Sequence, residues 1–246
     1  MKTIGVIPAR WASTRFAGKV LAEIAGKPMI QHVWERAKES KKLNDLIIAC
    51  DEECVLKAAK KFGANAVMTA KTHPSGSDRI AEVVEKISCD IVMNIQGDEP
   101  LIHHSVIDSL AEVFESDRNC NMATVIKILD KKEDWNNPNV VKVVIDEKKN
   151  ALYFSRSPIP YNCDNNIEAT SYKHLGIYAY KKDFLFTYKN LPKSSLEKIE
   201  QLEQLRVLEA GYKIKTVLTD YETIGVDTPD DLIRVKNIIE KKLVNG

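Results

Sequence analysis

A basic segment near the amino terminus combines residue types that bind phosphate. It runs Ala9-Arg10-Trp11-Ala12-Ser13-Thr14-Arg15-Phe16-Ala17-Gly18-Lys19 and comes just after the apolar stretch Thr3–Ile7. Small residues let backbone N–H groups approach an anion, and the three cations neutralise its charge. The segment is not a Walker A loop, because Ser13 stands where that loop has glycine and Val20 follows the lysine, and no GxGxxG pattern occurs. We interpret it as a phosphate-binding loop, with a solvated basic loop as the alternative.

Two carboxylates have the chemistry to hold a hard cation beside that phosphate. Asp98 stands in Gln96-Gly97-Asp98-Glu99-Pro100, just past the apolar stretch Ile91–Ile95. Asp227 precedes the helix-start pattern Thr228-Pro229, in which threonine caps and proline takes the first helical position. Magnesium typically takes one or two carboxylates and fills its other positions with phosphate oxygens and water. The alternative explanation of Asp98 is a turn, in which aspartate is common. The helix cap does not explain Asp227, because this residue precedes the capping threonine.

Other polar side chains give weaker signals. Arg156 stands among small and rigid residues in Phe154–Pro160, and its planar fork suits a carboxylate. Taken alone, a surface salt bridge is the simpler explanation of this arginine. The five histidines are dispersed without an HExxH pattern, and the five cysteines form no CxxC pair. These spacings argue against a zinc site and against a disulfide framework.

The elements that must position these residues alternate through the first hundred positions. The pattern predicts strands at Thr3–Ile7, Leu46–Ala49, Ala66–Met68 and Ile91–Ile95, and helices at Met29–Ser40, Glu52–Phe62 and Asp78–Lys86. Such alternation indicates βαβ units on a mostly parallel sheet. Ligands of such sheets bind beyond the carboxyl ends of the strands. We therefore expect the site at the loops Ala9–Lys19, Ala70–Ser77 and Gln96–Leu101.

The second half of the chain has a different pattern. Strands are predicted at Met122–Ile128, Val140–Ile145, Ala151–Phe154 and Tyr172–Tyr180, followed by a helix at Ile199–Ala210, a strand at Lys213–Leu218 and a helix at Asp230–Leu243. No repeat or Pro/Gly/Ser-rich linker separates the halves. We expect a single domain over residues 1–246, with a β-rich insertion at about 122–180.

Composition narrows the class of protein. The chain has 246 residues, of which 36 are basic and 35 acidic, so its formal net charge is +1. That balance gives no bulk electrostatic reason to bind nucleic acid or an anionic membrane. The apolar run at the start is too short for a signal peptide, and no stretch is long enough to span a bilayer. We expect reduced thiols and a cytoplasmic protein.

Nine segments, in this order, resemble the bacterial 3-deoxy-manno-octulosonate cytidylyltransferases, also called CMP-Kdo synthetases. They are Ile7–Arg10, Ser13–Arg15, Gly26–Ile30, Ser75–Arg79, Gln96–Pro100, Tyr153–Ser157, Lys173–Tyr178, Leu202–Arg206 and Gly225–Pro229. The resemblance covers essentially the whole chain. It implies a homodimeric nucleotidyltransferase with a Rossmann-like core, a mostly parallel sheet with helices on both faces. It further implies that CTP and 3-deoxy-D-manno-octulosonate give CMP-Kdo and pyrophosphate, with magnesium, for lipopolysaccharide synthesis.

The resemblance also implies roles for individual residues. Arg10, Ser13 and Lys19 would hold the triphosphate, and Ser75, Gly76 and Arg79 would lie against the nucleotide. Asp98 and Asp227 would carry magnesium, and with Arg10 and Lys19 they would form the catalytic group. The residues that would face the sugar acid are Gln96, Arg156, His174, Tyr178, Glu203 and Gln204.

Some alternatives stay open at the level of sequence. The family usually has Leu-Pro-Gly-Lys-Pro where this chain has Phe16-Ala17-Gly18-Lys19-Val20, so we expect a less rigid loop with the same role. The acceptor could instead be an 8-amino analogue of the sugar or a sialic acid, on which the chemistry would be the same. A non-catalytic nucleotide-binding regulator on this fold is the alternative of a different class, and the presence of both Asp98 and Asp227 argues against it.

Overall fold

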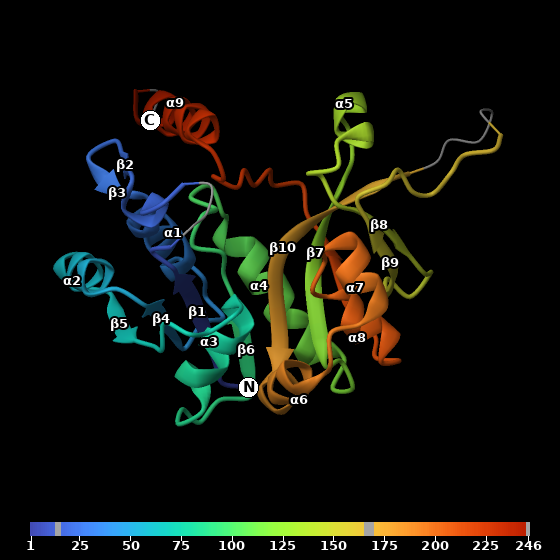
Figure 1. The fold of residues 1–246 in the computed structure, drawn as a ribbon, viewed down its shortest axis with the longest axis horizontal. Coiled ribbons are helices and arrows are strands. Elements are labelled where there is room, and N and C mark those ends of the chain that lie inside the picture. The colour runs from blue at the N-terminus through green and yellow to red at the C-terminus, as the bar shows by residue number, and fades with distance from the viewer. Residues whose placement is uncertain (13–15, 165–169, 245–246) are drawn as a thin grey trace. The chain divides into compact units, whose positions relative to one another are not determined.

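The computed structural model describes residues 1–12, 16–164 and 170–244, which form two compact units (Figure 1). The core unit comprises Met1–Asp108 together with the segment from Glu222 onward. The inserted unit comprises Ser109–Tyr221, and the segment expected as a β-rich insertion lies within it. Because the chain leaves the core unit and later returns to it, residues distant in sequence can meet there.

The core unit is built on a parallel sheet of four strands. These are β1 (Thr3–Ala9), β4 (Asp45–Cys50), β5 (Asn65–Met68) and β6 (Ile91–Asn94), in the spatial order β5-β4-β1-β6. In chain order this is third, second, first, fourth, which is how the strand order of a Rossmann fold begins. The order reverses between β1 and β6, and open α/β sheets bind their ligands beyond the strand ends at such a point.

Helices pack against this sheet, so that the expected α/β core is confirmed. They are α1 (Met29–Lys38), α2 (Glu53–Lys61) and α3 (Gly76–Val84), which contact strands β1, β4, β5 and β6. Pro28 caps α1, since its fixed φ suits the start of a helix and its missing N–H would have no intrahelical partner there. Strands β1, β4 and β6 are mostly apolar and buried, as expected of a sheet covered by helices, whereas the edge strand β5 is partly exposed. None of the described helices combines the length and apolar content needed to cross a membrane.

The carboxyl-terminal helix packs onto the amino-terminal part of the core unit. A short hairpin, β2 (Glu23–Ile24) with β3 (Lys27–Pro28), follows the 3-10 helix η1 (Lys19–Leu21). Helix α9 (Pro229–Val244) lies beside this hairpin, as Figure 1 shows. The buried residues that join them are Ile24, Met29, Val226, Val235 and Ile239. This apolar cluster fixes Val226, and therefore the neighbouring Asp227, near the end of the loop that follows β1.

The inserted unit has a mostly antiparallel sheet. Strand β10 (Tyr172–Lys181) pairs antiparallel with β7 (Met122–Ile128) and β8 (Lys142–Ile145), β9 (Ala151–Ser155) pairs with β8, and β11 (Lys215–Leu218) pairs parallel with β7. Its helices are α5 (Lys132–Asn136), α6 (Lys182–Asn190), α7 (Ser195–Glu200) and α8 (Leu205–Glu209). The predicted strands are confirmed here to within two residues at each end.

The structure corrects the sequence-based elements at two places and adds three helices. Strand β1 continues through Pro8 to Ala9, because β4 pairs along its whole length while β6 pairs only as far as Val6, and proline is tolerated where a strand has one neighbour. The single helix expected at Ile199–Ala210 is wrong. Gln201 adopts a left-handed conformation (φ 53°), which ends α7 before α8 begins. Helices α4 (His104–Ser116), α5 and α6 were not expected.

Candidate active site

Loops from the carboxyl ends of β1 and β6 meet in the core unit at a buried lysine. Nζ of Lys19 lies 2.7 Å from Oδ2 of Asp98 and 3.0 Å from Oδ1 of Asp227, and it donates to the carbonyl oxygen of Val226 at 2.8 Å. The Lys19 side chain is only 10% exposed. Burial by itself would lower the pKa of Lys19, but Asp98 and Asp227 outweigh it and hold the pKa above its usual value. The structure thus brings together three of the four expected catalytic residues.

Backbone contacts fix both carboxylates. The N–H of Val226 donates to the carbonyl oxygen of Asp98 at 2.9 Å, which ties the loop after β6 to the segment before α9. Asp231 accepts hydrogen bonds from the backbone N–H groups of Asp227 and Thr228, and Thr228 in turn caps α9. The predicted start of this helix at Thr228-Pro229 is therefore confirmed. Asp227 stands outside the cap, as the sequence pattern indicated.

The loop after β6 requires glycine beside Asp98. A Cβ on Gly97 would lie 2.9 Å from the carbonyl oxygen of Pro8 and 3.2 Å from Ile30, so any larger residue would push the loops after β1 and β6 apart. Next in the loop, Glu99 is buried, and this burial together with nearby Asp98 raises its pKa to about 8. Glu99 is accordingly protonated at neutral pH and adds no negative charge to the site. The raised pKa of Glu99 could not be predicted from the sequence, since burial depends on the folded loop.

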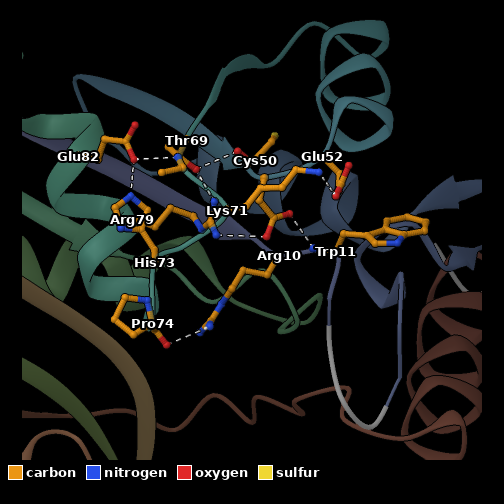
Figure 2. Close-up of polar contacts among 12 residues, drawn as sticks. Arg10, Trp11, Cys50, Glu52, Thr69, Lys71, His73, Pro74, Arg79 and Glu82 are labelled. Carbon is orange, nitrogen blue, oxygen red and sulfur yellow. Dashed lines mark hydrogen bonds and ion pairs between the residues drawn. The ribbon is translucent and has the colours of Figure 1, made fainter.

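The basic loop after β1 is closed upon itself. The N–H of Gly18 donates to the carbonyl oxygen of Trp11 at 2.9 Å, and Gly18 has a positive φ of 70° under the Trp11 ring. Glycine adopts that conformation without strain. Ser13, expected to hold the triphosphate, lies outside the described residues. Arg10 is exposed, and its Nη1 donates to the carbonyl oxygen of Pro74 at 3.4 Å, toward the loop that follows β5 (Figure 2).

A buried ion pair anchors the start of the same loop. Asp51 follows β4; its Oδ1 accepts the N–H of Trp11 at 2.9 Å and its Oδ2 faces Nη2 of Arg79 at 3.2 Å (Figure 2). Arg79 also donates to the hydroxyl of Thr69. The Arg79 side chain is completely buried, and burial lowers its pKa despite Asp51. Direct contact between Arg79 and a nucleotide stays a prediction, and the structure adds a positioning role through Asp51. Asp51 was missed because only the sheet brings it beside Trp11.

The loop after β5 is held by its own set of contacts. Glu82 accepts from the N–H of Ala70 at 3.0 Å and pairs with His73, and this pairing lowers the pKa of Glu82 (Figure 2). Ser75 caps α3, since its hydroxyl oxygen accepts from the N–H of Asp78 at 3.2 Å. A Cβ on Gly76 would make only ordinary contact with Pro8. The expected nucleotide contacts of Ser75 and Gly76 thus stay predictions beside an observed role in starting the helix.

In the inserted unit, Arg156 joins three backbone carbonyls. Its Nε donates to Glu200 at 2.8 Å, Nη1 to Pro138 at 2.8 Å, and Nη2 reaches Gln201 at 3.5 Å. The Glu200 carboxylate accepts the N–H of Arg156 at 2.9 Å and the hydroxyl of Ser155 at 2.6 Å. An arginine has five N–H donors, more than these carbonyls occupy. Binding of a sugar carboxylate by Arg156 stays a prediction. The observed partners of its guanidinium are backbone carbonyls, so the alternative of a surface salt bridge does not describe them.

Aromatic and polar side chains of the inserted unit cluster around β10. His174 Nε2 lies 2.8 Å from the hydroxyl of Thr124, and its ring lies 5.4 Å from that of Tyr178 across a register shift in β10. Bulges of this kind re-aim side chains near functional sites. Burial lowers the pKa of His174 to about 3 and raises that of Tyr178 well above its usual value, so both are neutral.

Two further expected sugar ligands lie between α7 and α8. Gln204 is buried, and within the described part of the chain its Nε2 has no hydrogen-bond partner. A buried amide without a partner is costly unless a ligand or water completes it. Glu203 is half-buried beside it, and Gln96, half-buried at the end of β6, belongs to the core unit. The structure therefore places the sugar candidates in both units.

The two aspartates have the character of a site for a hard cation. No cluster of three or more His, Cys, Asp or Glu side chains suited to a metal occurs among the described residues. The oxygens that do converge come from Asp98, Asp227 and the Val226 carbonyl, with the Lys19 ammonium among them. Carboxylate and carbonyl oxygens are the donors that magnesium prefers, and it needs few of them from the protein. The residues present fit magnesium, with the ammonium standing in for the cation.

Comparisons with known proteins identify the family. A family model described as cytidylyltransferase matches residues 4–214. The chain is 49% identical over 245 residues to the 3-deoxy-manno-octulosonate cytidylyltransferase of Solibacter usitatus, across 100% of this chain and 97% of that protein. It is 48% identical over 250 residues to that of Syntrophobacter fumaroxidans, with 100% of both chains covered.

A solved structure agrees. The structure of a CMP:2-keto-3-deoxy-manno-octonic acid synthetase complexed with CTP matches with a TM-score of 0.94 and 43% identity, across 98% of this chain and 100% of that one. The resemblance predicted from nine sequence segments is thereby confirmed over the full length. The chain belongs to the 3-deoxy-manno-octulosonate cytidylyltransferase family.

Proposed function

We propose that this protein transfers CMP from CTP to the anomeric hydroxyl of 3-deoxy-D-manno-octulosonate, with release of pyrophosphate. The observation that carries the proposal is the group Lys19, Asp98 and Asp227, gathered at the strand-order reversal of a Rossmann-like sheet. Full-length similarity to named octulosonate cytidylyltransferases supports the choice of substrates. We further propose that the enzyme acts in lipopolysaccharide synthesis, as a homodimer in the cytoplasm.

The reaction is an in-line displacement at phosphorus. The anomeric oxygen forms a bond to the α-phosphorus, the bond from that phosphorus to the bridging oxygen breaks, and pyrophosphate leaves with the electron pair while the hydroxyl proton passes to solvent. Such transfers depend mainly on positioning and on neutralising charge. Arg10 is exposed at the end of β1 and supplies a cation for the triphosphate. Asp51 and Arg79 hold the backbone of the adjoining loop in place.

Magnesium is part of the proposal, and Asp98 and Asp227 would hold it. When bound, such an ion neutralises charge on the phosphates and lowers the pKa of a nearby hydroxyl. Lys19 is already within 3.0 Å of both carboxylates, which supports a cation at this point.

The inserted unit supplies the candidates for the acceptor. Gln204 presents a buried amide without a partner among the described residues, which fits a sugar hydroxyl as an acceptor. His174 is held neutral by burial, so one ring nitrogen can donate and the other accept. Arg156 supplies the planar cation that suits the carboxylate next to the anomeric carbon.

Pyrophosphate release tests the proposal directly. The purified protein is mixed with CTP, magnesium and, in separate reactions, 3-deoxy-D-manno-octulosonate, its 8-amino analogue and a sialic acid. We expect release with the octulosonate, none without acceptor, and clear preference for CTP over ATP and GTP, because a site built for one base edge leaves polar groups unpaired with another.

The controls separate this function from its alternatives. Release only with the 8-amino analogue or with sialic acid would keep the chemistry and change the acceptor. Tight CTP binding with no release for any acid would make the protein a nucleotide-binding regulator and refute the proposal. Asp227→Asn serves as the inactive reference for contaminating activity.

A further inference from the structure

Lys19 cannot contact the two aspartates as observed and bind a triphosphate at the same time. An ammonium group has three N–H donors, and the Lys19 ammonium meets three oxygens, those of Asp98, Asp227 and the Val226 carbonyl, at 2.7 to 3.0 Å. In this arrangement it has no donor left for a phosphate oxygen. It can therefore contact a triphosphate only after it leaves the two aspartates.

A metal ion that binds the two aspartates would compete with Lys19. One oxygen of each carboxylate, Oδ2 of Asp98 and Oδ1 of Asp227, already points at the Lys19 ammonium. The side chain of Lys19 is buried, so the repulsion between this ammonium and a divalent ion is weakly screened. A metal ion that binds these two oxygens must displace Lys19, and a bound triphosphate is the anion toward which Lys19 can move.

We propose that Lys19 is an exchangeable counter-ion, which neutralises Asp98 and Asp227 in the nucleotide-free protein and is released to the triphosphate when metal and nucleotide enter together. The inference rests on the proposed role of the two aspartates as metal ligands. The four-carbon stem of lysine allows the head group to change partners, and the left-handed Gly18 precedes it in the chain. Lys19 thus keeps metal binding weak until nucleotide is present.

The consequence is an effect of opposite sign on the two ligands. Removal of the ammonium takes away a positive charge that both carboxylates contact, which should strengthen metal binding to the nucleotide-free protein. The same removal deprives the triphosphate of a cation, which should weaken CTP binding. A lysine that merely bound phosphate would change only the second quantity.

The test measures Mn²⁺ binding to the nucleotide-free protein by electron paramagnetic resonance of the free ion. Lys19→Met should bind Mn²⁺ at least about tenfold more tightly than wild type, because an unscreened charge of like sign has been removed. Lys19→Arg, which keeps the charge, should stay close to wild type. Lys27→Met removes an exposed lysine that pairs with Glu35 elsewhere in the core unit, and it should leave Mn²⁺ affinity unchanged. In steady-state kinetics, Lys19→Met should raise the KM for CTP.

Folding is checked by circular dichroism and thermal unfolding. If Lys19→Met does not fold, Lys19→Gln, which keeps N–H donors for the Val226 carbonyl, takes its place. A folded neutral variant that binds Mn²⁺ no more tightly than wild type would overturn the inference.

Further variants distinguish this failure from that of the proposed function. If Asp98→Asn and Asp227→Asn bind Mn²⁺ as wild type does, the metal site and the counter-ion both fail. If wild type releases pyrophosphate from CTP and the octulosonate while Lys19→Met shows no gain in Mn²⁺ affinity, only the counter-ion fails. If Lys19→Met gains Mn²⁺ affinity but wild type releases no pyrophosphate, the counter-ion stands and the function fails.

Discussion

At the scale of single residues, the site in the core unit depends on charges that balance only in the folded chain. Asp98, Asp227 and Lys19 come from three segments, and Lys19 neutralises part of the charge of each aspartate. Burial and Asp98 raise the pKa of the neighbouring Glu99 to about 8, which favours its neutral form. One lysine thus faces two aspartates, which suits a further cation that arrives with a nucleotide.

Asp227→Asn tests the contribution of the second carboxylate. The change removes a charged oxygen at nearly constant shape, so we expect turnover to fall at least about a hundredfold, or about 2.7 kcal/mol in the barrier. Asp230→Asn, an exposed carboxylate in the first turn of α9, is the matched control and should keep near-normal turnover. Near-normal turnover of Asp227→Asn at saturating magnesium would show that Asp227 is not a ligand.

His174 should make the stability of the protein depend on pH in a known direction. Its pKa falls from 6.5 to about 3 on burial, so between these values the unfolded chain binds the proton and the folded chain does not. Stability is then lost as the pH falls below about 6.5. At pH 5.5 the loss relative to pH 7.5 should be about 1.4 kcal/mol. Urea unfolding of wild type and His174→Gln at both pH values measures it.

Comparing the loss of unfolding free energy in wild type and in His174→Gln separates the contribution of His174 from those of all other titrating groups. His174→Gln keeps a polar group near Thr124, and its stability should fall less between pH 7.5 and 5.5 than that of wild type. Equal losses in the two proteins would mean that His174 is protonated in the folded state.

At the scale of elements, the loop after β1 is held at both of its ends. Asp51, at the end of β4, accepts the N–H of Trp11, and Gly18 closes the loop onto the Trp11 carbonyl. The apolar cluster of α9 and the β2–β3 hairpin then fixes Val226 beside Lys19. Backbone hydrogen bonds and apolar packing therefore position the loop, while Arg10 stays exposed at its start.

Asp51→Ala should destabilise the protein strongly. It leaves the completely buried guanidinium of Arg79 without its carboxylate partner, and breaking a buried pair in this way costs about 3–5 kcal/mol. Glu35→Ala breaks the exposed pair with Lys27 and should cost at most about 1 kcal/mol. Urea unfolding of both variants gives the comparison. Similar small losses would mean that the Arg79–Asp51 pair contributes no more than a surface contact.

At the scale of the whole molecule, the two units carry different sets of candidate residues. The core unit holds Arg10, Lys19 and both aspartates, whereas Arg156, His174, Tyr178, Glu203 and Gln204 belong to the inserted unit. A chain that leaves one unit and returns to it places Asp227, near its end, beside Lys19, near its start. We expect the first set to serve CTP and the second to serve the acceptor.

Arg156→Ala tests this division. The change removes the cation proposed for the sugar carboxylate, so the KM for the octulosonate should rise by about tenfold or more, which corresponds to 1.4 kcal/mol or more. The KM for CTP should change less. Arg156→Lys keeps the charge without the planar fork and should fall between wild type and Arg156→Ala. If only CTP use suffers, Arg156 belongs to the nucleotide site.

The sequence by itself determined the family and most of the strands and helices. Periodicity located every strand of the core sheet, because buried parallel strands are short apolar runs, and the Thr228-Pro229 cap located α9. It did not locate the break between α7 and α8, which depends on one left-handed residue, or the helices α4, α5 and α6. The nine segments indicated the family because their order and residue types can be read directly from the sequence.

Only the tertiary structure decided how the candidate residues relate to one another. The contacts of Asp51, the pKa of Glu99 and the complete burial of Arg79 could not be predicted, since burial and pairing arise from segments far apart in sequence. The same holds for Lys19, which the sequence indicated as a phosphate ligand and the structure places on the two aspartates. A sequence records which charges a chain carries, and the fold decides which of them meet, because the energy of a charge depends on its distance from others and on its exposure to water.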